Sequence, residues 1–143
     1  MEKEFIMKKE FVSFEVAVEL KNLGFDEPCI SLYKNKKLRY EIKDCNGIVD
    51  FYNEGGKVIS YLAPTFSQAF RFFREKYNIQ GYIYSSTVRG NAQKTKQFTG
   101  YIWNINGIDM PFLSTDARDE LHDTYEEAEL ACLQKMIEIV KNI

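Results

Sequence analysis

The sequence predicts an α+β fold of three helices and antiparallel strand groups, in the order α-ββββ-α-βββ-α. The same short pattern begins at Ser13, Thr65 and Thr124: a Ser or Thr is followed directly by an aromatic residue and, three residues after that, by an alanine. Each is typical of a helix start, because the hydroxyl accepts a hydrogen bond from an unpaired amide of the first turn. Between these sites the hydrophobic period changes to two, and tight-turn dipeptides separate the strands. Tight turns join antiparallel neighbours, which favours α+β over a doubly wound parallel sheet.

The first helix is expected from about Ser13 to Leu23, where Gly24 can take the left-handed conformation and Phe25 can fold back. The second helix ends in the same way, with Asn78 as its left-handed residue. It begins at a predicted capping box, in which Gln68 lies three residues after Thr65. Its expected core face is Phe66, Ala69, Phe70, Phe73 and Tyr77, and its outer face is Ser67, Arg71, Arg74 and Asn78.

The third helix is expected from Thr124 to about Ile143, with Glu127 completing a second capping box. Its apolar surface is too wide for a helix that lies lightly on a surface, which predicts a central packing element. The residues concerned are Ala128, Cys132, Leu133, Met136, Ile137, Ile139, Val140 and Ile143.

Strands are expected in two groups. The first is a meander of about four short strands over residues 29–62, at 29–33, 38–42, 48–52 and 58–62. In the second, residues 81–86 pair with residues 98–105, and Asn106-Gly107 makes a two-residue turn into residues 108–113. Spacing does not encode sheet order, so one sheet and two sheets both stay open.

A chain of 143 residues with 45% hydrophobic and 28% charged residues predicts one compact domain over residues 1–143, with residues 1–10 as a flexible N-terminal extension. No apolar run approaches the roughly 18 residues that cross a bilayer, so we expect no membrane partner. Three widely spaced cysteines favour buried thiols in a reducing compartment over disulfides. The cytoplasm is the expected location.

Charge is unevenly distributed along the chain. Residues 34–96 carry 12 Lys or Arg against 5 Asp or Glu, whereas residues 109–130 carry 1 against 8. One interpretation is a basic surface for phosphate with aromatic faces for bases, which would bind nucleic acid or a nucleotide. The other is that hairpin tips and helix backs are simply solvated, and that the acidic segment neutralises the basic one in the fold or across a homodimer. The second is the simpler.

The candidate binding residues of the first interpretation are Arg71, Arg74, Tyr82, Tyr84, Arg89, Lys94, Lys96 and Trp103. Four further cations, Lys34, Lys36, Lys37 and Arg39, are expected on a hairpin of the same basic surface.

The sequence contains no recognisable catalytic or cofactor motif. The glycine spacings of phosphate-binding loops do not occur, and the single histidine, His122, has no ligand pair at zinc spacing. A surface or capping role is expected for His122. We therefore expect no cofactor, no metal and no recognisable catalytic residue; an enzyme would need a site assembled from distant segments.

Three segments, residues 11–29 (FVSFEVAVELKNLGFDEPC), 63–77 (APTFSQAFRFFREKY) and 125–133 (YEEAELACL), resemble a family of small proteins encoded by gut anaerobes and their phages. The resemblance covers roughly 45 residues. That family has no assigned activity, cofactor or catalytic residue, so the resemblance implies an accessory cytoplasmic protein of mobile-element origin.

The first functional prediction is thus a non-enzymatic binding or adaptor protein with a protein partner. The second is a phosphate-recognising module for nucleic acid or a nucleotide, and the third is an enzyme with a dispersed site. The two oppositely charged segments also make a homodimer a reasonable expectation.

Overall fold

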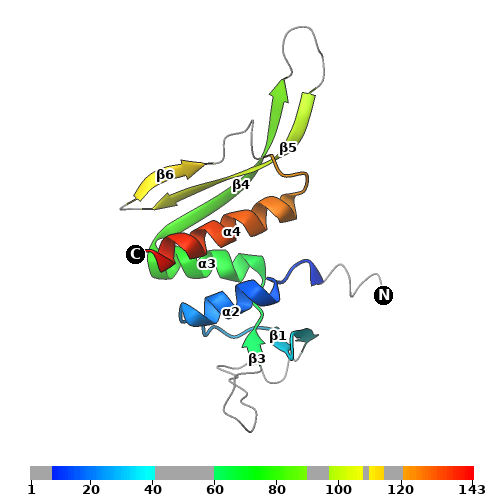
Figure 1. The fold of residues 1–143 in the computed structure, drawn as a ribbon, viewed down its shortest axis with the longest axis vertical. Helices are drawn as coiled ribbons and strands as arrows, with labels where there is room; N and C mark the ends of the chain where they lie inside the picture. Colours follow the sequence, from blue (N-terminus) through cyan, green and yellow to red (C-terminus); the bar gives the residue numbers. More distant parts are fainter. Residues whose placement is uncertain (1–7, 41–59, 90–96, 108–109, 115–120) are drawn as a thin grey trace. The chain divides into compact units, whose positions relative to one another are not determined.

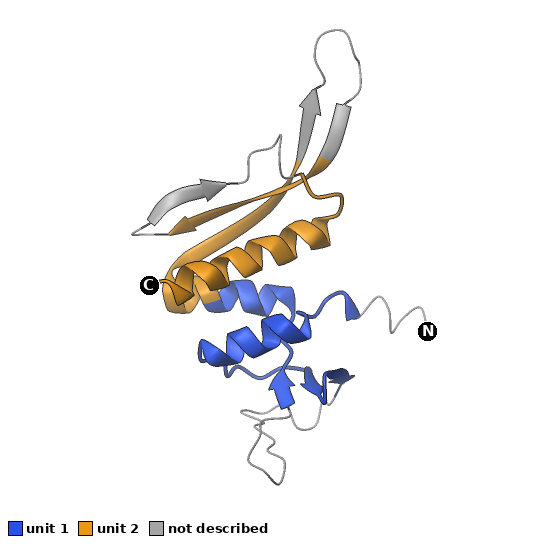
Figure 2. Cartoon of the chain, viewed as in Figure 1, with its two compact units in different colours: residues 1–72 blue, residues 73–143 orange. Residues whose placement is uncertain are grey.

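The computed structural model describes residues 8–40, 60–89, 97–107, 110–114 and 121–143. Within the strands it describes the backbone throughout, and the side chains of all residues except those in 86–99 and 110–114. Its elements confirm the α+β class and the predicted order (Figure 1). They fall into two compact units, residues 1–72 and 73–143, which Figure 2 colours separately. Each unit is described by itself below, and the single domain predicted from length stays a prediction.

The first unit contains helix α2 (Phe14–Asn22) and a sheet of β1 (Ser31–Lys34), β2 (Lys37–Tyr40) and β3 (Ser60–Leu62). The Ser13 side chain caps α2 by accepting a hydrogen bond from the Val16 amide, and Gly24 follows the helix with φ of 90°, as predicted. Aromatic contacts from Phe14 to Tyr33 and Tyr61 hold α2 against one face of the sheet.

The sheet of the first unit has the order β2-β1-β3, with both pairings antiparallel. The last strand therefore returns to β1, and the described strands do not follow a simple meander. The predicted strand at residues 48–52 lies outside the described residues. β1 takes the central position because its first three residues are buried, whereas β2 is largely exposed. The hydroxyl of Ser31 ties β1 to the following chain by donating to the Ala63 carbonyl at 2.8 Å.

Helix α3 (Phe66–Tyr77) begins at the predicted capping box: the Gln68 amide donates to the Thr65 hydroxyl at 3.2 Å, and the Thr65 amide donates to the Gln68 side chain at 3.0 Å. Asn78 ends it with φ of 54°, again as predicted. The expected outer face is exposed throughout. The core face also includes Phe72, which the predicted spacing missed and which packs edge-on against Phe25 at 5.3 Å.

The second unit contains β4 (Ile79–Arg89), β5 (Gln97–Gly107), β6 (Met110–Ser114) and helix α4 (Tyr125–Lys141). The sheet order is β4-β5-β6, so the two predicted strand groups form two sheets. Thr124 caps α4 by accepting from the Glu127 amide at 3.1 Å. The predicted apolar residues of α4 are buried except for the half-buried Ile139 and the exposed Ile143.

The predicted turn at Asn106-Gly107 is wrong. Both residues belong to β5, where Asn106 pairs with Gln80 and Gly107 pairs with Ile79. Gly107 also pairs with Met110, beyond an irregularity in the register after Ile105. The pairing with β4 extends β5 through the dipeptide, which local turn preference could not anticipate.

No helix within the described parts of the chain combines the length and the apolar character needed to cross a membrane.

Candidate functional site

One face of the second sheet brings together two predicted site residues, Tyr82 and Tyr84, beside the buried Ile102. Residues that pair across antiparallel strands point to the same face, and Tyr82 pairs with Asn104 while Tyr84 pairs with Ile102. We call this surface the tyrosine face; its described members are Gln80, Tyr82, Tyr84, Ile102, Asn104 and Asn106. None of them is charged.

Both tyrosines present their rings to solvent while their hydroxyls are held. Tyr82 is 46% exposed and Tyr84 43% exposed. The Tyr82 hydroxyl donates to the side-chain carbonyl of Gln80, and the Asn104 amide donates to the Tyr84 hydroxyl at 3.0 Å. A tethered ring loses little conformational entropy when a ligand packs on it, which is what a recognition surface needs.

The opposite face of the same sheet is covered by α4. Tyr125, at the start of α4, meets Tyr101 of β5 edge-on at 5.8 Å. Because side chains alternate along β5, Trp103 and Ile105 share that covered face with Tyr101. Trp103 is 8% exposed. The prediction that Trp103 offers a stacking face is therefore wrong: its indole is a core group.

The sequence of this hairpin also carries three cations that are not members of the tyrosine face. Residues 79–107 contain Arg89, Lys94 and Lys96 but no Asp or Glu. The structure places the backbone of Arg89 at the end of β4, opposite Gln97. The Arg89 side chain, Lys94 and Lys96 lie outside the described residues, so their predicted part in a site stays a prediction.

The two predicted arginines of α3 have different surroundings. Arg71 donates to a Glu27 carboxylate oxygen at 3.3 Å, so its charge is already balanced within the first unit. Arg74 is exposed, one helical turn on. Among the described residues no hydrogen bond or ion pair joins Arg74 to Tyr82 or Tyr84.

The described cysteines are buried thiols, as predicted. Burial raises the pKa of Cys132 to about 12, although the backbone of Tyr82 lowers it in part through a hydrogen bond. A thiol that stays protonated at neutral pH is a poor nucleophile and a poor metal ligand. Cys29 donates its thiol hydrogen to the Glu27 carbonyl at 3.3 Å. Both groups serve packing.

His122 has a structural role that the sequence did not indicate. Its backbone exchanges two hydrogen bonds of 2.9 Å with Tyr101 in an isolated antiparallel bridge, so the chain before α4 pairs with β5. The cap of α4 is Thr124, so the capping role predicted for His122 is wrong. The described residues contain no group of three His, Cys, Asp or Glu side chains placed to hold a metal ion.

A second surface, in the first unit, is built on the hairpin of β1 and β2. Its turn is Asn35-Lys36, with φ of 51° and 64°, and we call Lys34, Lys36, Lys37 and Arg39 the basic turn. All four cations are exposed. The sequence predicted them on a hairpin but missed the turn itself, whose one local signal is the asparagine, a residue that tolerates left-handed φ.

Comparison with known proteins yields no match to a family model, to a curated protein or to a solved structure. The resemblance to a phage-associated family therefore stays a prediction.

Proposed function

We propose that this protein is a non-enzymatic binding protein for single-stranded nucleic acid, and that unpaired bases stack on the tyrosine face. The observation that carries the proposal is the pair of exposed, hydroxyl-tethered rings of Tyr82 and Tyr84 on an uncharged sheet face. Aromatic side chains bind bases in single strands because every base presents a π-face, whereas paired bases are buried in the duplex.

Charge supports a polyanionic partner for the same hairpin. Over residues 79–107 the sequence has three cations and no acid, although Asp and Glu outnumber Lys and Arg in the whole chain by 21 to 19. A local excess of positive charge attracts a phosphate backbone and accelerates association. The exposed side chains of Gln80 and Asn106 share this face with the rings, and their amide groups offer planar hydrogen-bonding partners to base edges.

The test is fluorescence anisotropy with labelled single strands of dT and dA, a duplex of equal length, and the variant Tyr82→Ala/Tyr84→Ala. Stacking contributes about 1–3 kcal/mol per base, so we expect the double variant to bind single strands at least about fivefold more weakly. The wild type should prefer single strands to the duplex.

Tyr125→Ala is the matched control. Tyr125 belongs to the same unit and is as exposed as Tyr84, at 43%, but it lies with α4 on the other side of the sheet. We expect Tyr125→Ala to bind like the wild type, and circular dichroism to show that all variants are folded. Equal binding by wild type and double variant would refute the proposal. Failure of the wild type to bind any single strand would also refute it, and would favour the protein partner predicted from the sequence.

A further inference from the structure

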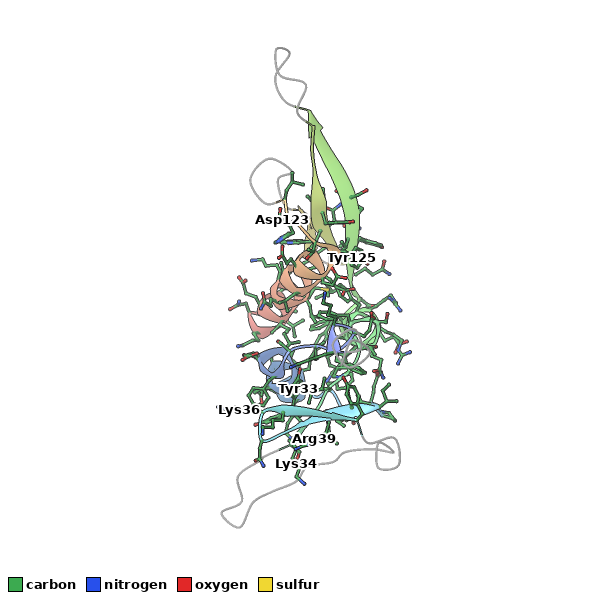
Figure 3. The ribbon with its side chains drawn as sticks, turned by 90° about the vertical axis from the view of Figure 1, so that its right-hand side faces the viewer. Tyr33, Lys34, Lys36, Arg39, Asp123 and Tyr125 are labelled. Atoms are coloured by element: carbon green, nitrogen blue, oxygen red, sulfur yellow. The ribbon has the colours of Figure 1, made fainter. Side chains whose placement is uncertain are left out.

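Strand β4 forms one edge of the sheet in the second unit. β5 lies between β4 and β6, so β5 is paired on both sides (Figure 1). On the same side as β6, the chain at His122 also pairs with Tyr101 of β5, and Asp123, the next residue, is labelled in Figure 3. Among the described residues, no strand pairs with the outer side of β4. The backbone groups on that side are therefore open to a further strand.

The hydrogen bonds of Tyr101 show which backbone groups of β4 point outward. The N–H and C=O of Tyr101 both bond to His122, so they point away from β4. Tyr101 lies opposite Ser85, and this is therefore a non-hydrogen-bonded pair of the β4–β5 ladder. Because such pairs alternate along β4, the N–H and C=O groups of Gly81, Ile83 and Ser85 point away from β5. Ser85 is exposed, and Gly81 and Ile83 are half-buried, so a partner strand can reach this edge.

β4 lacks the features that usually protect a strand edge. Natural edge strands are short, charged, bulged or interrupted by proline, because an unprotected edge pairs with other chains. The other edge strands that the structure describes follow this rule: β2 has four residues with Lys37 and Arg39, β3 has three residues, and β6 contains Pro111. β4 has eleven residues in unbroken register with β5, and residues 79–88 include neither a charged residue nor a proline. An edge of this kind is expected to have a partner strand.

We propose that β4 pairs antiparallel with β4 of a second copy of this chain, which joins two sheets into one continuous sheet across a two-fold axis. Such an axis pairs one residue with its own equivalent, and Ile83 is the middle one of the three outward residues. With Ile83 at the axis, Gly81 lies opposite Ser85 of the second copy, and Tyr82 lies opposite Tyr84 of the second copy. Residues 79–87 of each copy are then paired.

The sequence of β4 is complementary to itself in this register. Because residues 79–88 are uncharged, no like charges oppose each other across the axis. Tyr82 and Tyr84 exchange places between the copies, and aromatic pairs across strands stabilise a sheet. These pairs are of the non-hydrogen-bonded kind, in which the side chains lie closer together. Gly81 weakens a strand interior, and a glycine in that position is typical of a close approach by another backbone.

The two-fold axis places both tyrosine faces on one side of the joined sheet. Residues opposed across antiparallel strands point to the same face, so the rings of Tyr82 and Tyr84 from both copies share one surface. A nucleic-acid strand on this surface meets four rings in place of two. That role rests on the proposed function, but the pairing of β4 with a second copy does not.

The first experiment measures the mass in solution of the wild type, Ser85→Pro and Ser85→Thr by analytical ultracentrifugation. Proline removes the outward N–H of Ser85 and leaves the bonds between β4 and β5 in place, whereas threonine keeps the N–H. We expect dimers for the wild type and Ser85→Thr, and a monomer for Ser85→Pro with an unchanged circular dichroism spectrum. A monomeric wild type would overturn the proposal, as would a folded Ser85→Pro variant that is still a dimer.

The second experiment does not depend on a proline variant. Cα atoms of a non-hydrogen-bonded pair lie about 4.5 Å apart, which is within the range of a disulfide. Tyr82→Cys and Tyr84→Cys are oxidised separately and as an equal mixture, with the wild type as the background from the native cysteines. We expect cross-linked dimers in the mixture alone. A cross-link in Tyr84→Cys by itself would overturn the register, and no cross-link above background in any sample would overturn the pairing.

The dimer and the proposed function can fail separately. Tyr82→Ala/Tyr84→Ala keeps every outward backbone group, so it should remain a dimer while it loses affinity for single strands. A dimeric wild type that binds no single strand would leave the dimer standing and refute the proposed function. A monomeric wild type that binds single strands through the tyrosine face would do the reverse. Where both proposals hold, a bound Ser85→Pro monomer should cover about half as many nucleotides as a wild-type dimer.

Discussion

Gly100 has no side chain, and this allows the chain before α4 to approach β5 closely. A Cβ atom at this position would lie 2.9 Å from the His122 carbonyl oxygen and 3.1 Å from Leu121 Cβ. The nearest neighbour is backbone, and it is fixed by the two hydrogen bonds between His122 and Tyr101, so it cannot move aside cheaply. We expect Gly100→Ala to lower the free energy of unfolding by about 1–3 kcal/mol, as overpacking does. Urea unfolding measures this directly, and an unchanged midpoint would contradict the close approach.

Cys132 should make the protein sensitive to alkaline pH. Burial raises its pKa from 9.0 to about 12, so the folded state favours the neutral thiol while the unfolded state ionises more readily. The stabilisation is present in full below pH 9 and is lost as the pH rises from 9 towards 12, with a slope approaching about 1.4 kcal/mol per pH unit.

This dependence can be isolated with Cys132→Ala, because other groups that titrate above pH 9 are common to both proteins. Tyr33 and Tyr125, whose pKa values are also raised by burial, remain in the variant. We expect the free energy of unfolding of the wild type to fall more steeply between pH 9 and 10.5 than that of the variant. Parallel curves would mean that the thiol is not desolvated.

The turn between β1 and β2 can be improved by one substitution. Asn-Gly is the preferred pair for a two-residue hairpin turn, and Lys36 occupies the glycine position with φ of 64°. We expect Lys36→Gly to raise the free energy of unfolding by about 1 kcal/mol, since glycine takes this conformation without steric cost. Lys36→Ala removes the same charge but keeps the strained conformation, so it should give little gain. Equal stabilisation by both variants would assign the effect to charge instead.

The helices show how far local signals reach. Ser13, Thr65 and Thr124 each cap a helix as predicted, because capping depends on residues within one turn of each other. Gly24 and Asn78 end two helices for the same reason. Residue periodicity also identified β4 and β5, but not that Asn106 and Gly107 continue β5, since that depends on the partner strand.

The candidate site shows where local signals stop. Tyr82 and Tyr84 lie two residues apart on β4, so a common face was predictable, and the structure exposes both rings. Side chains also alternate along β5, and Trp103 points to the face opposite the two tyrosines. Helix α4 packs on that opposite face and buries Trp103, although α4 begins more than twenty residues later in the chain. The strain at Lys36 likewise depends on the register of β1 and β2, which hydrophobic spacing does not specify.

Helix α3 links the two compact units through one continuous stretch of backbone. The boundary lies between Phe72 and Phe73, in the middle of the helix, and both residues are buried. A helix interrupted at this point would lose the hydrogen bonds that span the break, and the remaining pieces would be too short to be stable alone. Loss of one unit should therefore destabilise the other, and we expect a single cooperative unfolding transition, in agreement with the one domain predicted from length.

Leu20→Ala tests this coupling, because Leu20 is fully buried in the first unit while Trp103, the only tryptophan of the chain, reports on the second. The truncation should cost about 2–5 kcal/mol. If the units unfold together, Trp103 fluorescence and far-ultraviolet circular dichroism will give coincident urea transitions, and both midpoints will fall by the same amount. Leu133→Ala, at a buried position of the second unit, should act in the same way. If Leu20→Ala lowers only the circular dichroism midpoint and leaves the Trp103 transition in place, the units are independent domains, and α3 does not couple them.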